Sequence, residues 1–372
     1  MRKWPIWMAA GLCATALSGC GTPAAAQPAA PLHSSTSAAS SRAAKGHHPS
    51  TAHSGGSTTS TTAHPKAEPV AANPAPQRTA APPQGSAATP VMPEAVVIGN
   101  DPNARPQAGL HSASVVWEIL AEGWITRYLA IFAQQASPKI GPVRSARIYF
   151  DQLAGAYGVP FAHAGGNVDA LNNIGPLHIQ NLDQIYGSAA YFWRGVSRTP
   201  PDNLYTSTTL LNAAARNRHF HRPLSPYPAS GVLAAGGKRT ASVRLNYLTD
   251  PPVYTYVAGW TWSGGWWYRN INGVPSRVQD GAAIRAGSVI ILVARQAPDP
   301  DPYTPGALKI LWQDGGTAWV LRGGVRLRGT WRMGSHGLPV VYGAGGHVLA
   351  AGHRAPYWYE VVPSAADVSF AP

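Results

Sequence analysis

Residues 114–120, Ser-Val-Val-Trp-Glu-Ile-Leu, form a run of β-branched and aromatic side chains that is typical of a buried β-strand. A second such run, Arg-Tyr-Leu-Ala-Ile-Phe-Ala, follows at 127–133. Apolar residues then recur at nearly helical spacing over 145–157, and residues 158–166 have the pattern of another buried strand that ends in a glycine turn. This alternation of strand, helix and strand predicts a layered α/β domain over residues 94–236.

The rest of the chain, residues 240–368, has a different pattern. Short β-rich runs such as 253–257 and 289–293 are separated by Gly, Asn-Gly and Asp-Gly, which is typical of antiparallel sheets. We therefore predict an α+β protein, with an N-terminal layered α/β domain followed by a β-rich, mostly antiparallel C-terminal domain.

The N-terminus has the features of a bacterial lipoprotein signal. Two cations precede an apolar run at 4–17, and Leu17-Ser18-Gly19-Cys20 resembles a lipobox, in which the cysteine receives a diacylglycerol. We predict a signal peptide at 1–19 and lipidation, including acyl chains such as palmitate, at Cys20; a plain secretory signal is the alternative. Two acyl chains give stable anchoring, which predicts a position on the extracytoplasmic face of the cell membrane.

Residues 20–93 are rich in Ala, Pro, Ser and Thr and contain no aromatic residue. Such a segment cannot bury enough apolar surface to offset the entropy of ordering, so we predict a disordered tether. Cys20 would be the only cysteine of the mature chain, since Cys13 would be removed with the signal peptide. No disulfide, metal site or cofactor is therefore expected.

The chain is poor in charge, at 12% of its 372 residues, yet its formal net charge is +13. A basic protein favours anionic partners, and a surface location makes nucleic acid an unsuitable one. Peptidoglycan, another anionic wall polymer or envelope proteins fit better. No internal apolar run reaches the length of a membrane span.

Several blocks, in their order along the chain, resemble the YerB-like lipoprotein family, whose two domains carry unknown-function labels. They are Gly99–Leu110, Glu122–Arg127, Ile140–Arg147, His163–Gly166, Phe192–Arg194 and Asp202–Ser207. The resemblance covers about 94–365 and implies an α/β domain joined to a β-rich one on a lipid-anchored surface protein.

These blocks concentrate arginines in sequence that is otherwise poor in charge. The candidate ligand-binding residues are Arg105, Arg127, Arg144, Arg147, Arg194 and Asn203. A guanidinium binds carboxylate or phosphate through two parallel hydrogen bonds, so the cluster predicts an anion-binding cleft. The alternative is an internal ion-pair network with nearby acids, because a buried arginine needs a partner.

Glu118, Glu122 and His163 are the candidate catalytic residues. On a strand, the two glutamates would lie about 13 Å apart at roughly 3.3 Å per residue, beyond the carboxylate spacing of glycosidases. His163 follows an apolar strand and precedes a glycine turn, where it would act as an acid/base or ligand. The alternative for His163 is a hydrogen bond to a backbone carbonyl.

Two features of the C-terminal segment suggest further surfaces. Arg326, Arg328 and Arg332 share one face of an expected strand and could follow an anionic polymer, or form a solvated sheet face. Tryptophans are also clustered there and could stack on sugars or pack in the core. They are Trp260, Trp262, Trp266 and Trp267.

The leading hypothesis is thus a lipid-anchored envelope protein that binds a wall glycan or an envelope partner through the arginine-rich cleft. One alternative is an enzyme that cleaves wall glycan with Glu118 or Glu122 as acid/base. The other is an envelope scaffold without glycan contact.

Overall fold

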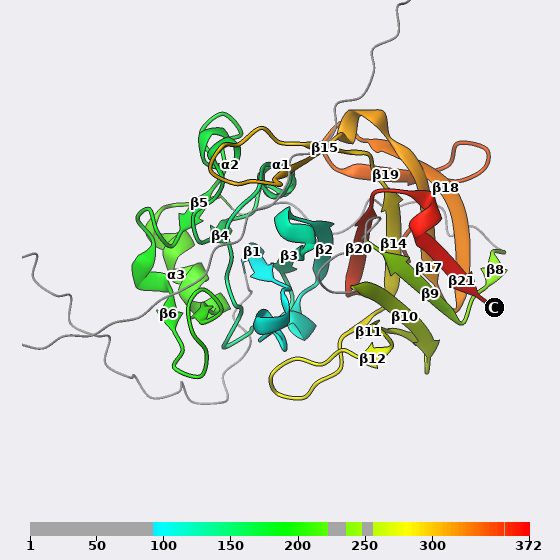
Figure 1. Ribbon diagram of the computed structural model, residues 1–372, viewed down its shortest axis with the longest axis horizontal. Coiled ribbons are helices and arrows are strands. Elements are labelled where there is room, and N and C mark those ends of the chain that lie inside the picture. The colour runs from blue at the N-terminus through cyan, green and yellow to red at the C-terminus, as the bar shows by residue number, and fades with distance from the viewer. Residues whose placement is uncertain (1–91, 222–235, 248–255, 353) are drawn as a thin grey trace, which may run out of the picture. The chain divides into compact units, whose positions relative to one another are not determined.

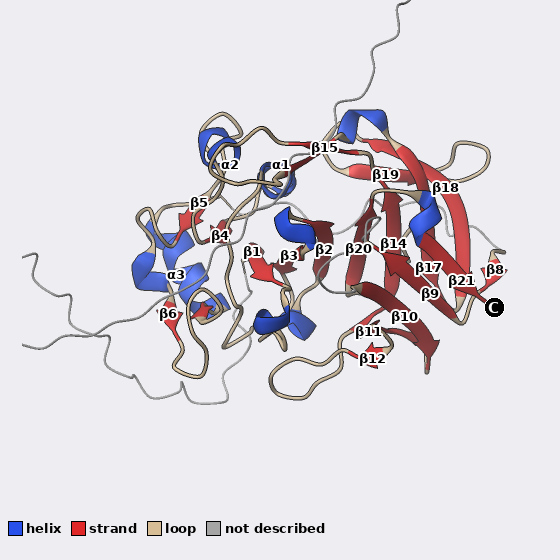
Figure 2. Cartoon of the chain, viewed as in Figure 1, coloured by secondary structure: helices blue, strands red, loops and turns tan. Residues whose placement is uncertain are grey.

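The computed structural model describes residues 92–221, 236–247, 256–352 and 354–372 (Figures 1 and 2). The predicted signal peptide, Cys20 and the tether up to residue 91 lie outside the described residues. Among the described residues no helix is both long and apolar enough to cross a membrane.

Strands dominate the described residues, and most of them join one large sheet (Figure 2). Its strand order is β19 (Pro339–Tyr342), β18 (Val325–Met333), β17 (Gly316–Arg322), β14 (Ser288–Val293), β20 (Tyr357–Val362), β2 (Val115–Leu120), β3 (Thr126–Phe132), β1 (Glu94–Gly99), β4 (Phe161–His163) and β5 (Asn181–Asp183), with β8 (Lys238–Arg239) paired to β18.

A second sheet packs against the large one and comes from the C-terminal segment. Its order is β12 (Val274–Pro275), β11 (Trp266–Ile271), β10 (Val257–Ser263), β9 (Ser242–Asn246) and β21 (Val368–Ala371), with β13 (Arg285–Ala286) paired to β11. Two small hairpins, β6 (Trp193–Arg194) with β7 (Leu204–Tyr205) and β15 (Gln296–Pro298) with β16 (Leu308–Ile310), complete the strands.

The large sheet is buried on both faces at its centre, where all residues of β2 and β20 are buried. Alternate residues of β2 enter two separate hydrophobic clusters, so that Val116 belongs to one and Trp117 to the other. Helix α1 (Ile148–Tyr157) packs in the Trp117 cluster. The second sheet and α3 (Thr208–Asn217) contribute to the Val116 cluster. Helix α2 (Val168–Asn173) packs beside α1.

The N- and C-terminal segments meet within the large sheet. Strand β20, from the end of the chain, lies between β14 and β2 and runs parallel to both (Figure 1). Strands from both segments therefore share one hydrogen-bonded ladder and both hydrophobic clusters.

The strands expected at 114–120, 127–133 and 158–166 are confirmed as β2, β3 and β4. The helix expected at 145–157 begins at Ile148, because Arg147 is extended, and it ends at Gly158 in the left-handed region. The C-terminal segment is β-rich and mostly antiparallel, with β20 as the exception. In the N-terminal segment only β1, β4 and β5 run parallel, whereas β2 and β3 are antiparallel to each other. The alternation of strand and helix patterns in the sequence does not show which strands pair parallel and which antiparallel.

Candidate functional site

The predicted arginine cluster is divided among several partners in the structure. Arg127 and Arg147 both form ion pairs with Glu122, and Arg147 Nε lies 2.8 Å from Glu122 Oε2. Burial alone would raise the pKa of the Glu122 carboxyl, but the charges of Arg127 and Arg147 outweigh burial and hold it below its ordinary value. Both arginines are therefore engaged within the fold by one shared carboxylate.

Arg144 makes a separate cluster with Asp101, at 2.8 Å, and with Asp202. Asp101 also accepts hydrogen bonds from the backbone amides of Asn103 and Ala104, so it caps the short 3-10 helix Pro102–Ala104. Despite partial burial, the hydrogen bond and charge of Arg144 lower the pKa of Asp101. Arg144 thus fixes two loops through their carboxylates.

The remaining three residues lie elsewhere. Arg194 donates to Asn203 Oδ1 at 2.9 Å, and Asn203 donates to the carbonyl of Gly195, which closes the β6–β7 hairpin. Arg105 donates to the backbone of Asp101 and lines a pocket of about 480 Å³ with Arg277. For Arg127, Arg144 and Arg147 the observed geometry is the ion-pair alternative. A ligand-binding role for the six residues stays a prediction.

Glu118 lies at the centre of a buried polar network. Its carboxylate accepts hydrogen bonds from Thr126 Oγ1 at 2.8 Å and Arg269 at 2.5 Å, and its side chain is 0% exposed. Glu360 is its partner across the β2–β20 ladder and accepts from Tyr247 and Trp260 at 2.5 and 2.6 Å. Burial, together with the neighbouring Glu118 charge, raises the pKa of Glu360. The network joins both sheets and leaves Glu118 out of reach of a substrate.

His163 is equally enclosed. It is 0% exposed, with Nδ1 2.8 Å from the carbonyl oxygen of Gly165 and Nε2 2.7 Å from Asn181 Oδ1. Both ring nitrogens are thereby engaged in holding the turn after β4 against β5. The described residues contain no group of three or more His, Cys, Asp or Glu that could hold a metal ion.

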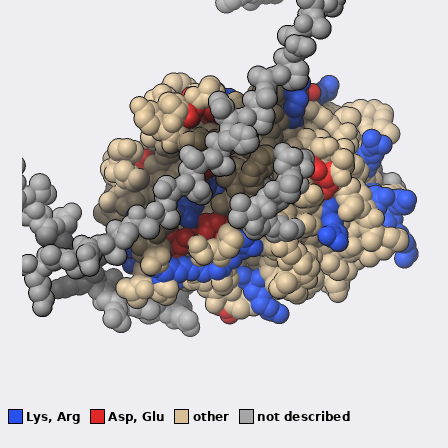
Figure 3. Space-filling model, in the orientation of Figure 1, with Lys and Arg blue, Asp and Glu red and all other residues tan. Residues whose placement is uncertain are grey.

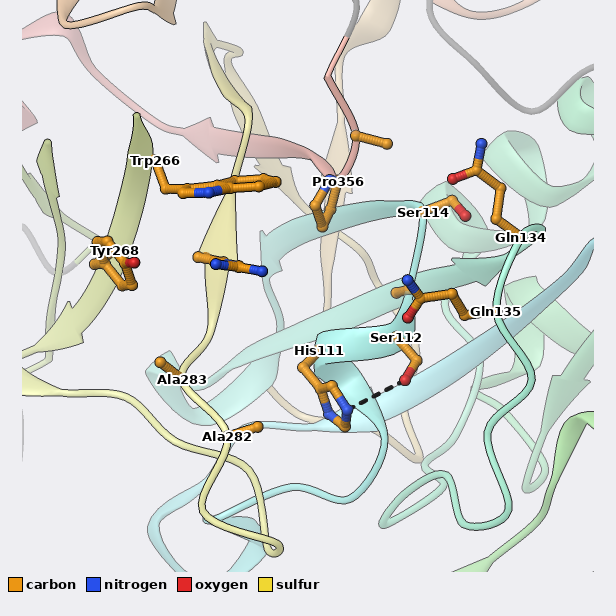
Figure 4. Close-up of a pocket in the computed structure, with 13 residues that line it drawn as sticks. His111, Ser112, Ser114, Gln134, Gln135, Trp266, Tyr268, Ala282, Ala283 and Pro356 are labelled. Atoms are coloured by element: carbon orange, nitrogen blue, oxygen red, sulfur yellow. Dashed lines mark hydrogen bonds between the residues drawn. The ribbon is translucent and has the colours of Figure 1, made fainter. Parts of the chain in front are cut away.

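A pocket of about 350 Å³, here called the Trp266 pocket, opens between the two segments (Figure 4). Its polar lining comes from both of them. The N-terminal side contributes His111, Ser112, Ser114, Gln134 and Gln135, and the C-terminal side contributes Trp266, Tyr268 and Arg285. No acidic side chain lines the pocket.

The strand geometry of β11 explains why these aromatic residues face outward. Trp266 and Tyr268 are two residues apart, so they share one face, and Trp267 and Arg269 share the other. Trp267 is 0% exposed in the core, whereas Trp266 and Tyr268 are only partly buried and line the pocket. Trp260, on β10, is also fully buried.

The exposed Arg285 stacks on an aromatic ring at the pocket. Its guanidinium carbon lies 4.2 Å from the ring centroid of Trp266, and that of Arg354 lies 4.1 Å from the same ring. Tyr268 is the cross-strand partner of Arg285. Stacking orients a guanidinium without neutralising it, and the ion pairs of the described residues do not include Arg285.

The other polar side chains of the pocket are amides, hydroxyls and an imidazole, which offer hydrogen bonds. Gln134 and Gln135 are exposed just after β3, and each amide has two donors and an acceptor oxygen. His111 Nε2 lies 3.3 Å from Ser112 Oγ (Figure 4) and 3.9 Å from the carboxylate of the exposed Asp280, which is outside the pocket lining, while Nδ1 is buried without a partner in the described structure. The pocket thus combines one oriented cation with amide, hydroxyl and imidazole groups. Reasoning from sequence missed Arg285, because its place beside Trp266 and Tyr268 depends on the pairing of β13 with β11 in the folded chain.

Two family models match this chain over more than half of its length. They are described as "Protein of unknown function (DUF3048) N-terminal domain", over residues 79–221, and the corresponding C-terminal domain, over residues 243–352. The chain belongs to this family, and the resemblance to YerB-like proteins is confirmed.

The chain is similar in particular to the Bacillus subtilis (strain 168) protein named "Putative lipoprotein YerB". The two are 36% identical over 160 residues, which cover 42% of this chain and 48% of the relative, about half of its length. It is also similar to the crystal structure of the YerB protein from Bacillus subtilis, with a TM-score of 0.67 and 28% identity. That match covers 76% of this chain and 95% of the YerB chain.

Proposed function

We propose that this protein is a lipid-anchored component of the bacterial cell envelope that binds an acidic wall glycan through the Trp266 pocket. The lipoprotein name of its relative and the lipobox-like Leu17–Cys20 support the anchored location. The observation that carries the binding role is Arg285, stacked on Trp266 without an acidic partner, within an otherwise uncharged polar pocket.

The chemistry of the pocket suits a sugar that bears a carboxylate. Arg285 would bind the carboxylate through two parallel hydrogen bonds, because its planar guanidinium is already oriented. The amides of Gln134 and Gln135 and the hydroxyls of Ser112 and Ser114 would pair with sugar hydroxyls, which both donate and accept. A few such groups in a largely preformed pocket fix ligand orientation.

Binding of soluble peptidoglycan fragments, followed by intrinsic tryptophan fluorescence, tests this role. Arg285→Ala should weaken binding by about tenfold or more, because two charge-assisted hydrogen bonds are lost and one alone is worth about tenfold, while Arg285→Lys retains part of the affinity. Arg295→Ala is the matched control, since Arg295 is 73% exposed, pairs with Asp314 and lies outside the pocket. Equal affinities in all four proteins would overturn the proposal.

Two further experiments, incubation with intact peptidoglycan and recovery of bound envelope proteins, separate the other two functions. Release of new soluble fragments from intact peptidoglycan, detected by mass spectrometry, would favour an enzyme. Glu118 would not be its acid/base, because its carboxylate is buried and held by four donors. Recovery of envelope proteins without any glycan affinity would favour the scaffold.

Anchoring is tested independently at Cys20. Cys20→Ala should abolish labelling by radioactive palmitate and should leave the protein unprocessed or mislocalised. Continued labelling of the variant, together with detergent partitioning, would show that Cys20 is not the lipid attachment site.

A further inference from the structure

A basic groove, distinct from the Trp266 pocket, lies where the edge of the large sheet meets the second sheet. We propose that this groove, lined by Lys238, Arg326 and Arg328, binds the phosphate groups of a phosphodiester polymer. Its volume is about 560 Å³, and Trp319, Val368 and Phe370 complete its walls. On the face shown in Figure 3, Lys and Arg gather over β8 and β18.

The strand register brings like charges together in this groove. Lys238 is the cross-strand partner of Arg326 in the β8–β18 pair. Arg328 lies two residues further along β18, on the same face as Arg326 and about 6.6 Å away at 3.3 Å per residue. Like charges directly opposite each other destabilise a sheet. An anion between them removes that repulsion and gains hydrogen bonds.

None of the three cations is neutralised by the described residues. The ion pairs of this part of the chain involve other side chains. Arg326 is nevertheless oriented, because its guanidinium lies 4.2 Å from the Phe370 ring centroid and donates to Thr240 Oγ1 at 3.2 Å. Arg328 is exposed across from Trp319. Orientation without neutralisation also characterises Arg285.

The shape of the groove favours a polymer over a membrane surface. A membrane-binding surface would present large apolar side chains to the lipid. The exposed large apolar residues of the described chain are Trp124, Val168, Ile185, Tyr186, Val196, Val274 and Tyr303. None of these lines the groove, whose apolar wall residues Trp319, Val368 and Phe370 are buried or half-buried. A concave surface with cations spaced along a strand instead fits a flexible chain with regularly spaced phosphates.

The test measures binding of a short poly(glycerol phosphate) to the full-length protein by titration calorimetry at several salt concentrations. Lys238→Ala and Arg328→Ala should each weaken binding about tenfold. Each should also reduce the salt dependence, because one phosphate contact and its counterion release are lost. Arg328→Lys should retain most of the affinity. Arg295→Ala, which removes one positive charge elsewhere, should bind like the wild type.

The outcomes separate the alternatives. Losses confined to the groove variants support the proposal and leave the function of the Trp266 pocket to its own test. Absence of polymer binding, or equal losses in Arg295→Ala, overturns it. A second arm compares vesicles with and without phosphatidylglycerol. If Arg328→Ala removes a preference for anionic vesicles while polymer binding is absent or unchanged, the groove contacts membrane and the polymer proposal is wrong.

Discussion

The arginines of the two segments differ in their surroundings. In the N-terminal segment Arg127, Arg144 and Arg147 are paired with carboxylates. In the C-terminal segment Arg285 and Arg326 are stacked on aromatic rings without a carboxylate. A cluster of arginines in the sequence therefore does not show whether those arginines are available to bind a ligand. The acids that fold onto them decide whether a cation is free to bind a ligand.

Arg269 and Arg295 are C-terminal arginines that do pair with a carboxylate. Arg269 is the buried one of these two, and its replacement should give the largest effect. It is buried against Glu118, so Arg269→Met leaves an uncompensated charge inside the protein. The free energy of unfolding should fall by about 3 to 5 kcal/mol, measured by urea denaturation. Adding Glu118→Gln should recover part of the loss, since the unpaired charge is then absent. If Arg269→Met alone were as stable as the wild type, the description of a buried polar network around Glu118 would be wrong.

Asp151 is an N-terminal carboxylate without a hydrogen-bond partner in the described structure. Burial raises its pKa to about 9, and the charge of Arg147 only partly opposes this. The ordinary value is about 3.9. Between about pH 4 and pH 9 the Asp151 carboxyl is ionised in the unfolded chain but still protonated in the folded chain. Because the folded chain binds one more proton, the free energy of unfolding falls as pH rises through this range.

Asp151→Asn should therefore gain stability relative to the wild type as pH increases from 5 to 8. The difference can change by at most about 1.4 kcal/mol per pH unit for one group. Urea denaturation at three pH values measures it. Parallel pH profiles of the two proteins would mean that Asp151 titrates normally.

The ion pairs at Glu122 should give a smaller effect, because the carboxylate has two partners. Arg147→Ala should lower the free energy of unfolding by about 1 to 3 kcal/mol, as Arg127 still pairs with Glu122. Thermal and urea unfolding measure the loss. A variant of unchanged stability that lost wall binding would restore the predicted ligand site at these residues.

The unpaired arginines should give the smallest change in stability. Arg285→Ala and Arg328→Ala remove exposed side chains, so each should shift the free energy of unfolding by less than about 1 kcal/mol. Circular dichroism melting measures this, and it also establishes that any loss of binding is not a loss of folding. A large destabilisation would place either residue among the structural arginines.

Much of the local structure follows from the sequence, since 114–120 and 127–133 carry unbroken β-rich runs and form β2 and β3. The insertion of β20 beside β2 could not be predicted, because pairing between distant strands depends on tertiary packing. The same limit applies to the site. Arg144 and Asp202 are far apart in sequence, so their pairing and the freedom of Arg285 appear only once the chain is folded.

The position of β20 in the large sheet also limits when the sheet can finish folding during synthesis. Strands β2 and β14 are synthesised well before residues 357–362, and their facing edges have no partner until that segment arrives. Long-range parallel pairing is slow, and open strand edges bind other chains. A newly made chain therefore needs protection from self-association until β20 is available. A nonsense mutation before Tyr357 would remove β20 and divide the large sheet at its centre. The edges of β2 and β14 would then be unpaired and prone to aggregation, so the truncated chain would not be functional.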